Sequence, residues 1–536
     1  MKLRLSGLRD RECWAQAGFE TPRFDAEQVG RETRRQPMWL HIGAGNIFRA
    51  FPAAMMQTLI ERGECGRGLT VAECFDGEII DRAYTPYDCL TALCVLCGDG
   101  TVKKKIVASV AEALRCDGEK PEDDRRFMEI MAAKSLQMVS LTITEKGYAV
   151  MDAQGRPLPG VERDLFAPPA AATTTIGKLA AGLYARFRQG KAPIARVSLD
   201  NCSHNGDKLR AAVLYIAEGW REENRVEKEF VQYLLDEKKV AFPISMIDKI
   251  TPRPDRQVAD MLAAAGFEDA APFVTRKGTY TAAFVNAEET EYLVIEDKFP
   301  AGRPPLEKAG VYFTDRETVD KAEKMKVCTC LNPLHTALAV LGCLLSFEKI
   351  SDEMKDPDLN ELVRRIAYRE AMPVVVDPGI LSPEKFAAEV LEKRFPNPFM
   401  PDTPQRIATD TSQKLPIRYG ETLKKYCASA ELDPASLRYI SFVLAAWLRY
   451  LMAVDDQGRA FAPSPDPMLA QMQEALSFLK LGDTVTEGQL APVLAREDIF
   501  GVDLNKAGLA PRVTARLSEM LQGPGAVRAA LKKVLA

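Results

Sequence analysis

One run of sequence near the start of the chain constrains the fold more than any other. In PMWLHIGAGNIFRAF (37–51), the apolar residues from Met38 to Ile42 predict a buried strand, and Gly43-Ala44-Gly45 predicts a tight turn. A helix is expected next, and LTVAECFD (69–76) reads as a second strand. The apolar residues of that helix recur at helical spacing: Ala53, Met56, Leu59 and Ile60. This order is a βαβ unit, which predicts a parallel sheet.

Later segments repeat the same design. Strands are expected in QMVSLTITEKGY (137–148) and in ARVSLDNCSHNGDKL (195–209), and a hairpin around the Gly-Asp-Gly turn that separates 90–97 from 101–110. Because these strands alternate with helical stretches, we expect an α/β Rossmann-type N-terminal domain with a mostly parallel sheet. Residues 1–36 read as a leader that packs on this domain.

The pattern becomes helical after a segment rich in proline, glycine and lysine (296–310). The residues of 437–451 form an apolar stripe at helical spacing, as expected of a mostly α-helical C-terminal domain. We therefore predict an NAD-binding domain over residues 1–300 and a helical substrate-binding domain over 301–536.

Composition excludes several classes of function. A net charge of -4 gives no reason to expect nucleic acid as a partner. The start, MKLRLSGLRDREC, lacks the apolar run of a signal peptide, and the apolar stretches 336–347 and 439–448 are shorter than a membrane span. Twelve cysteines without a secretory signal predict reduced thiols, and hence a cytoplasmic protein without membrane contact. Only three histidines are present, which argues against a catalytic metal site.

The glycine turn predicts where a dinucleotide binds. Gly43 permits the tight turn, and Gly45 lets the backbone approach a pyrophosphate at a helix N-terminus. Phe48 stands where the usual fingerprint has a third glycine. The second strand should end in an acid for the ribose hydroxyls: Asp76, with Glu73 as runner-up. No arginine directly follows Asp76, so NAD is favoured over NADP, although Arg82 lies close by in sequence. The further cofactor contacts that we expect are Asn46, Ile47, Phe48, Thr144 and Glu145.

Three polar clusters carry groups suited to ketone reduction. They are Asp200-Asn201-x-x-x-Asn205-Gly206, a second cluster around Asp248 (242–252), and Lys326-x5-Asn332-x-x-His335. Hydride transfer to a ketone needs a proton donor and groups that stabilise the developing alkoxide, and lysine, amide and imidazole groups supply these without a metal.

These clusters resemble those of the mannitol dehydrogenase family, the polyol-specific long-chain dehydrogenases. The matching strings are HIGAGNIFRAF, SLTITEKGY, SLDNCSHNG, FPISMIDKITP, VIEDKF with GRP, LNPLHTALA and RIATDTSQKLPIRYGETL, in the family's order from about residue 37 to 425. The resemblance implies a Rossmann domain, a helical C-terminal domain and a site in the cleft between them. It also implies a small-molecule substrate, and members of the family are often monomeric.

The resemblance implies a role for each polar residue. Lys326 looks like the catalytic lysine, general acid in reduction and base in oxidation, and Asn201 and Asn332 look like the amide pair that holds the substrate oxygen. His335 and Asp248 look like substrate-orienting groups, with Asn205 beside them, while Glu145 relays the proton or lies near the nicotinamide. Two alternatives stay open: Asn201 and Asn205 as helix caps, and Asp248 in a salt bridge with Lys249. His41 and His204 are expected to be structural.

The spacing of the lysine departs from the family. The family has four residues between the lysine and the asparagine, whereas here there are five. On a straight helix the extra residue turns Lys326 by about 100° away from the site. A kink at Asn332-Pro333 or a π-bulge would absorb it, and Lys324 lies still further off register.

The choice of substrate depends on positive charge. The carboxylate of a hexuronate is bound best by cationic side chains, and Arg406, Lys414 and Arg418 are the candidates. Enzymes that act on neutral polyols carry basic residues in this segment too, so the discrimination is weak. Among the members of the family that the chain resembles, the hexuronate reductases are our first expectation: an NAD-dependent fructuronate reductase (mannonate oxidoreductase), followed by tagaturonate reductase. The alternatives are a polyol 2-dehydrogenase and, from another class, a catalytically altered nucleotide-binding protein.

Overall fold

The computed structural model describes all 536 residues and divides into two compact units. The Rossmann unit comprises residues 1–97 and 101–319, and the helical unit comprises 98–100 and 320–536. Our sequence-based boundary, between 300 and 301, falls inside the Rossmann unit. The reason is that strand β15 (Tyr312–Thr314) pairs with β14 (Tyr292–Glu296) and so ties residues beyond 300 to that unit.

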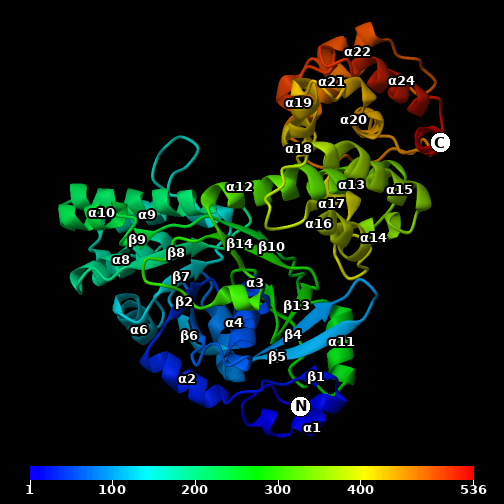
Figure 1. Cartoon of the computed structure of the whole chain (residues 1–536). Coiled ribbons are helices and arrows are strands. Elements are labelled where there is room, and N and C mark those ends of the chain that lie inside the picture. The colour runs from blue at the N-terminus through cyan, green and yellow to red at the C-terminus, as the bar shows by residue number, and fades with distance from the viewer. The chain divides into compact units, whose positions relative to one another are not determined.

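A six-stranded, wholly parallel sheet forms the centre of the Rossmann unit (Figure 1). Its strands run in the order β6-β3-β2-β7-β8-β9. Taken in chain order, these are the third, second, first, fourth, fifth and sixth strands of the sheet, the arrangement of dinucleotide-binding Rossmann folds. The bounds are β2 Trp39–Ile42, β3 Leu69–Glu73, β6 Val110–Arg115, β7 Met138–Leu141, β8 Ile194–Ser198 and β9 Val240–Ala241.

Helices cover both faces of this sheet because alternate strand residues point to opposite sides. Leu40, Val139 and Ile194 belong to one apolar core, and Trp39, Met138 and Ala195 belong to the other. Helices on the first face are α6 Pro121–Ala132, α7 Pro159–Phe166, α8 Thr175–Arg188, α9 Asn205–Glu222 and α10 Lys228–Leu235. Helices on the second face are α3 Asn46–Ala50, α4 Pro52–Glu61 and α5 Glu78–Ala83.

Three smaller sheets complete the Rossmann unit. A mixed sheet has the order β1-β5-β4-β13, with β1 Phe19–Glu20, β4 Thr91–Leu96, β5 Val102–Val107 and β13 Phe284–Glu288. The predicted hairpin is therefore present, as β4 and β5, but outside the main sheet. A second sheet joins β10 (Ser245–Asp248), β14 and β15, and β11 (Phe273–Val274) pairs with β12 (Tyr280–Thr281). The leader contributes β1 as well as α1 Arg11–Gln16 and α2 Ala26–Arg35, and α11 spans Arg256–Ala264.

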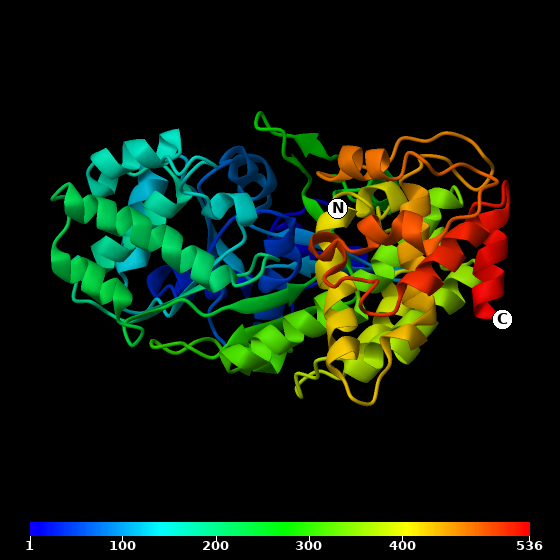
Figure 2. The same cartoon turned by 90° about the horizontal axis from the view of Figure 1, so that it is seen from above.

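The helical unit contains no strand, as the yellow-to-red part of Figure 2 shows. Its core is built on α13 and α20, whose side chains are buried on almost every face. The helices are α13 Asn332–Leu344, α14 Ile350–Glu353, α15 Pro357–Arg365, α16 Pro383–Glu389, α17 Pro404–Ile407, α18 Thr411–Arg418, α19 Gly420–Ala428, α20 Arg438–Tyr450, α21 Leu469–Ala475, α22 Glu487–Leu494, α23 Glu497–Phe500, α24 Ala510–Met520 and α25 Ala526–Leu535. The predicted fold class, Rossmann-type followed by helical, is confirmed.

One continuous helical run links α12 (Arg316–Met325), a π-helix labelled η6 (Lys326–Cys330) and α13. This run, Arg316–Leu344, is the one helix whose length and composition would allow it to cross a membrane. However, 78% of its most apolar window is buried inside the protein, as in a core helix.

Candidate active site

The glycine turn after β2 has the geometry that a nucleotide site requires. Gly43 has a φ of +107°, and a Cβ there would lie 2.2 Å from the Thr142 carbonyl oxygen, so only glycine fits. A Cβ on Gly45 would meet nothing within 4 Å. Open space therefore lies next to the Gly45 backbone, at the start of α3, where a pyrophosphate could approach.

The aromatic residue in place of the third glycine packs inside the protein. Phe48 is fully buried and stacks on the His41 ring, with centroids 4.4 Å apart. His41 lies between the hydroxyls of Ser140 and Thr142, at 2.6 and 2.9 Å, and burial lowers its pKa to about 3. His41 is thus structural, as expected. The Phe48 ring is part of the protein core, and the cofactor contact of this residue stays a prediction. Asn46 and Ile47 lie at the start of α3, where Asn46 accepts a hydrogen bond from the buried Arg49.

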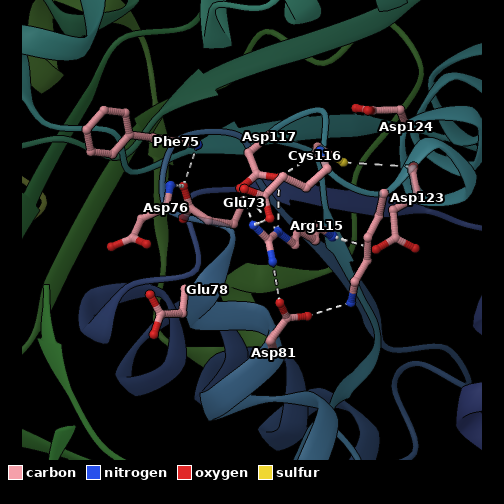
Figure 3. A network of polar contacts seen from close by, with 12 residues as sticks. Glu73, Phe75, Asp76, Glu78, Asp81, Arg115, Cys116, Asp117, Asp123 and Asp124 are labelled. Atoms are coloured by element: carbon pink, nitrogen blue, oxygen red, sulfur yellow. Dashed lines mark hydrogen bonds and ion pairs between the residues drawn. The ribbon is translucent and has the colours of Figure 1, made fainter. Parts of the chain in front are cut away.

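Two acids follow β3, and they have different partners. Glu73 accepts hydrogen bonds from the backbone N–H groups of Ala44 (2.8 Å), Phe75 (2.9 Å) and Asp76 (3.1 Å), so it fixes the glycine turn. One oxygen of Asp76 accepts hydrogen bonds from the hydroxyls of Thr275 and Thr279, each at 2.6 Å. Figure 3 shows Phe75 and Asp76 directed away from Arg115, which binds Asp81 and Asp117.

These elements enclose a cavity of about 400 Å³. Its lining combines the glycine turn, the end of β3 and the loop after β7: Gly43, Gly45, Glu73, Phe75, Asp76, Thr142, Ile143, Thr144 and Thr279 are among the residues. The cavity lies at the carboxyl ends of β2 and β7, where the strand order reverses, which is where open α/β sheets bind ligands. The residues present therefore fit a dinucleotide.

The loop after β7 is held by a carboxylate from the next strand. Asp200 accepts hydrogen bonds from the N–H groups of Ile143 (3.0 Å) and Thr144 (2.9 Å) and from the Tyr148 hydroxyl. Thr144 has a φ of 64°, a strained conformation for a β-branched residue. Asp200 thus holds Thr144 at the cavity wall. Glu145 is exposed and pairs with Lys208 at 2.5 Å.

The two asparagines that follow β8 have different environments. Asn201 is exposed, whereas Asn205 is fully buried. The Asn205 amide donates to the carbonyl oxygens of Asp200 and Ser245 and to the Ser245 hydroxyl, each at 3.0 Å, and it accepts from the Ser245 N–H at 2.9 Å. All of its polar atoms are used within the Rossmann unit, so Asn205 joins α9 to β10, in place of the substrate contact that we predicted. Neither asparagine is the cap of α9, whose N-cap is His204.

Asp248 is buried at the end of β10. The neighbouring Lys249 binds Glu291 (2.8 Å) and the Glu288 carbonyl oxygen (2.7 Å). Lys249 therefore forms its ion pair with Glu291, and the alternative of a salt bridge between Asp248 and Lys249 was wrong.

The extra residue between Lys326 and Asn332 is absorbed by the π-helix η6. The Leu331 N–H donates to the Lys326 carbonyl oxygen at 3.1 Å, five residues back, and Leu331 then breaks the helical backbone with φ -127° and ψ -65°. Helix α13 begins at Asn332 with Pro333 in its first turn. Lys326 is 3% exposed. Of the two devices that the sequence suggested, the π-bulge and the break before Pro333 are both present.

His335 lies among cationic side chains of the helical unit. Burial, together with the positive charges of Arg418, Arg406, Arg394 and Lys414, lowers its pKa to about 3. Its ring packs on Phe395 at 4.9 Å, and its Nε2 atom is 3.6 Å from Asp402. His335 is therefore neutral at physiological pH, so it can donate or accept a hydrogen bond through its ring nitrogens but does not act as a general acid.

The cations around His335 differ in how they are paired. Arg406 is 58% exposed and forms an ion pair with Asp402. Arg418 donates to the Thr336 hydroxyl at 2.6 Å, and Lys414 donates to the carbonyl oxygens of Ile407 and Thr409. Neither Arg418 nor Lys414 has a carboxylate within 4 Å. Burial lowers the pKa of Arg418 to about 10 and lowers that of Lys414 as well. Arg394 and Phe395 were not predicted, because they lie about 60 residues away from His335 in the chain and no local pattern links them to it.

Comparison with known proteins identifies the group to which this arrangement belongs. Residues 37–308 match the mannitol dehydrogenase Rossmann domain, and 318–521 match the mannitol dehydrogenase C-terminal domain. The chain belongs to the mannitol dehydrogenase family. It is 50% identical to a D-mannonate oxidoreductase from Thermotoga maritima over all of this chain and 99% of the relative. A polyol:NADP oxidoreductase from Gluconobacter oxydans is 28% identical over 86% of this chain and 88% of its own.

A solved structure shares the same architecture. Mannitol 2-dehydrogenase from Pseudomonas fluorescens, in ternary complex with NAD and D-mannitol, is 26% identical, with a TM-score of 0.68 over 100% of this chain and 99% of its own. As a member of the mannitol dehydrogenase family, this chain is an oxidoreductase that acts on a CH–OH group with a nicotinamide cofactor. No group of three or more His, Cys, Asp or Glu side chains is placed to hold a metal ion.

Proposed function

We propose that this protein reduces a ketohexuronate to a hexonate with NADH, reversibly and without a metal. Fructuronate is the first choice of substrate, and tagaturonate is the second. The observation that carries the proposal is the set of cations around His335, in which Arg418 and Lys414 have no carboxylate partner. The identity to a D-mannonate oxidoreductase over the whole chain supports the same choice.

The electrostatics of these cations favour an anionic substrate. Burial of a positive charge that has no carboxylate in direct contact is costly, and burial is the main reason why the pKa values of Arg418 and Lys414 are lowered; Asp410 and Asp466 offset the effect at Lys414 only in part. A substrate carboxylate would restore the balance, and the fork of Arg418 suits bidentate binding. Arg406 contributes less in this proposal because Asp402 already neutralises it.

In this proposal, each polar residue of the site has one role in the reduction of the ketone. A bound dihydronicotinamide supplies the hydride. Lys326 donates a proton to the ketone oxygen, while the amides of Asn201 and Asn332 hold that oxygen. His335 is neutral at the working pH and orients a substrate hydroxyl by hydrogen bonding, so the proton falls to Lys326. Asp248 orients the substrate.

We propose NAD(H) as the preferred cofactor, because Asp76 places a negative charge in the cavity wall where a 2′-phosphate would be repelled. Thr144 lies in that wall and would contact the cofactor, and Glu145 beside it would assist proton transfer. All twelve cysteines are free thiols, in keeping with a cytoplasmic protein. A monomer is expected.

The decisive test compares NADH oxidation with fructuronate, tagaturonate and the neutral ketose fructose. We expect kcat/KM to be highest for a ketohexuronate. Arg418→Gln should lower kcat/KM for the ketohexuronate by about 10–100-fold, the value of one charged hydrogen bond, and should change turnover of fructose far less. Arg418→Lys is the matched control, since it keeps the charge and should recover part of the loss.

Other outcomes would favour the alternatives. A preference for fructose or a polyol would indicate a polyol 2-dehydrogenase, an alternative that the mannitol-bound solved relative supports. No turnover with any ketose or ketohexuronate would indicate a nucleotide-binding protein with altered catalysis.

A further inference from the structure

The hairpin formed by β11 and β12 closes one edge of the nucleotide cavity. Its turn, residues 275–279, is attached to the end of β3 because Asp76 accepts hydrogen bonds from the hydroxyls of Thr275 and Thr279. The Arg276 N–H donates to Glu78 at 2.8 Å, which adds a second attachment. Because Thr279, Phe75 and Asp76 all line the cavity, this hairpin borders the place where an adenosine ribose is expected.

The hairpin carries two adjacent cations, and only one of them is neutralised. Arg276 lies 3.4 Å from Glu78, which also pairs with Arg82 at 2.9 Å. The Lys277 ammonium donates to the Phe75 carbonyl oxygen and lies 4.4 Å from the centre of the Phe75 ring. It has no carboxylate within 4 Å. Asp117, the next acid along this edge, is bound to Arg115 at 3.0 Å.

Phe75, the residue beneath Lys277, is unusual for this position. Its ring is 66% exposed, the highest exposure among the large apolar side chains of the protein. It immediately precedes Asp76 and lines the cavity. The Lys277 ammonium therefore lies over the residue that immediately precedes the expected ribose-binding acid, Asp76.

We propose that Lys277 is a cofactor-specificity residue that binds the 2′-phosphate of NADP(H), so that the protein uses NADPH as a second cofactor. Asp76 and Lys277 oppose each other in this proposal. The carboxylate favours the free ribose hydroxyls of NADH, and the ammonium offsets its repulsion of a 2′-phosphate. Asp76 also holds the hairpin in place through Thr275 and Thr279. The residue that disfavours NADPH therefore also positions Lys277, the residue that binds the 2′-phosphate in this proposal. This proposal rests on the proposed function only in assuming that the cavity binds the nucleotide.

Binding measurements test the proposal without any turnover. Calorimetry of the whole protein with 2′,5′-ADP, which carries the 2′-phosphate, and with 5′-AMP, which lacks it, should show that both bind, with 2′,5′-ADP the weaker of the two because Lys277 offsets only part of the repulsion from Asp76. Lys277→Gln should weaken 2′,5′-ADP binding by about tenfold or more, as expected for a charged contact to phosphate, and leave 5′-AMP binding nearly unchanged. Arg276→Gln is the matched control on the same turn; because Glu78 already neutralises Arg276, its effect should be within about threefold.

The kinetic counterpart is the ratio of kcat/KM for NADPH to that for NADH, which Lys277→Gln should lower by about tenfold or more and Lys277→Arg should preserve. The proposal is overturned if Lys277→Gln leaves 2′,5′-ADP binding intact, if it weakens both nucleotides equally, or if Arg276→Gln has the larger effect. Failure of the proposed function has a different signature, since it would abolish turnover of ketohexuronates while nucleotide binding and its dependence on Lys277 persist.

Discussion

Replacing Asn205 by alanine separates a structural role from a substrate-binding role. The variant removes four hydrogen bonds that join the start of α9 to Asp200 and Ser245. Each such bond contributes about 1 kcal/mol net, and a buried donor left unpaired, such as the Ser245 N–H, costs more. We expect the free energy of unfolding of the Rossmann unit to fall by about 3–5 kcal/mol, and its melting temperature by about 5–15 °C.

Tryptophan fluorescence is a suitable assay because Trp14, Trp39 and Trp220 all lie in the Rossmann unit and are buried. The matched control is Asn201→Ala, at an exposed position four residues away, which should melt as the unmodified protein does and lose turnover instead. A variant Asn205→Ala that melts normally and shows a raised KM for the ketone would refute the structural assignment and restore the substrate contact.

Further variants test the other assignments. Lys326→Ala should depress kcat by about 100-fold or more while nucleotide binding persists, and normal turnover would exclude Lys326 as the proton donor. Asp76→Asn should raise the NADPH-to-NADH ratio more than Asp76→Ala does, because the asparagine oxygen can still accept the threonine hydroxyls that hold the hairpin; the reverse order would contradict this. Burial raises the pKa of the Glu353 carboxyl in the folded protein. The protonated carboxyl therefore contributes its whole stabilisation below about pH 4.5, the pKa in the unfolded chain. As the pH rises from there toward the pKa of the folded state, the free energy of unfolding falls by up to about 1.4 kcal/mol per pH unit. Urea unfolding from pH 5 to 9 should therefore show a shallower decline for Glu353→Gln, and parallel curves would disprove the claim. Activity should survive prolonged dialysis against a strong chelator, and recovery with zinc after a loss would rule out metal independence.

The parts of the fold that depend on local sequence were predictable. The turn at Gly43 and Gly45, the buried strand before it and the helix after it follow from hydrophobic spacing and from the conformational freedom of glycine, and the structure has all three. The same holds for α20, whose apolar stripe was evident, although the helix is buried all round rather than on one face. Short-range patterns determine these elements, so one sequence suffices.

The contacts that were missed depend on residues far apart in the chain. Asn205 could not be recognised as structural because its partner Ser245 is 40 residues away. The pairing of β13 with β4 joins segments almost 200 residues apart, and nothing local to either strand indicates it. The cations near His335 come from three separate elements, so their grouping, unlike their charges, appears only in the folded chain.

Because residues 326–330 form a π-helix, the number of residues between Lys326 and Asn332 does not by itself fix how far the helix turns between them. A π-turn accommodates one more residue than an α-turn while the helices on both sides keep packing against their neighbours. An insertion here therefore leaves the protein core in place, and the number of residues between lysine and asparagine can drift among relatives without a loop being added. An alignment that forbids a gap inside a helix would place the residues on the two sides of η6 one position out of register with a chain that has an uninterrupted α-helix here.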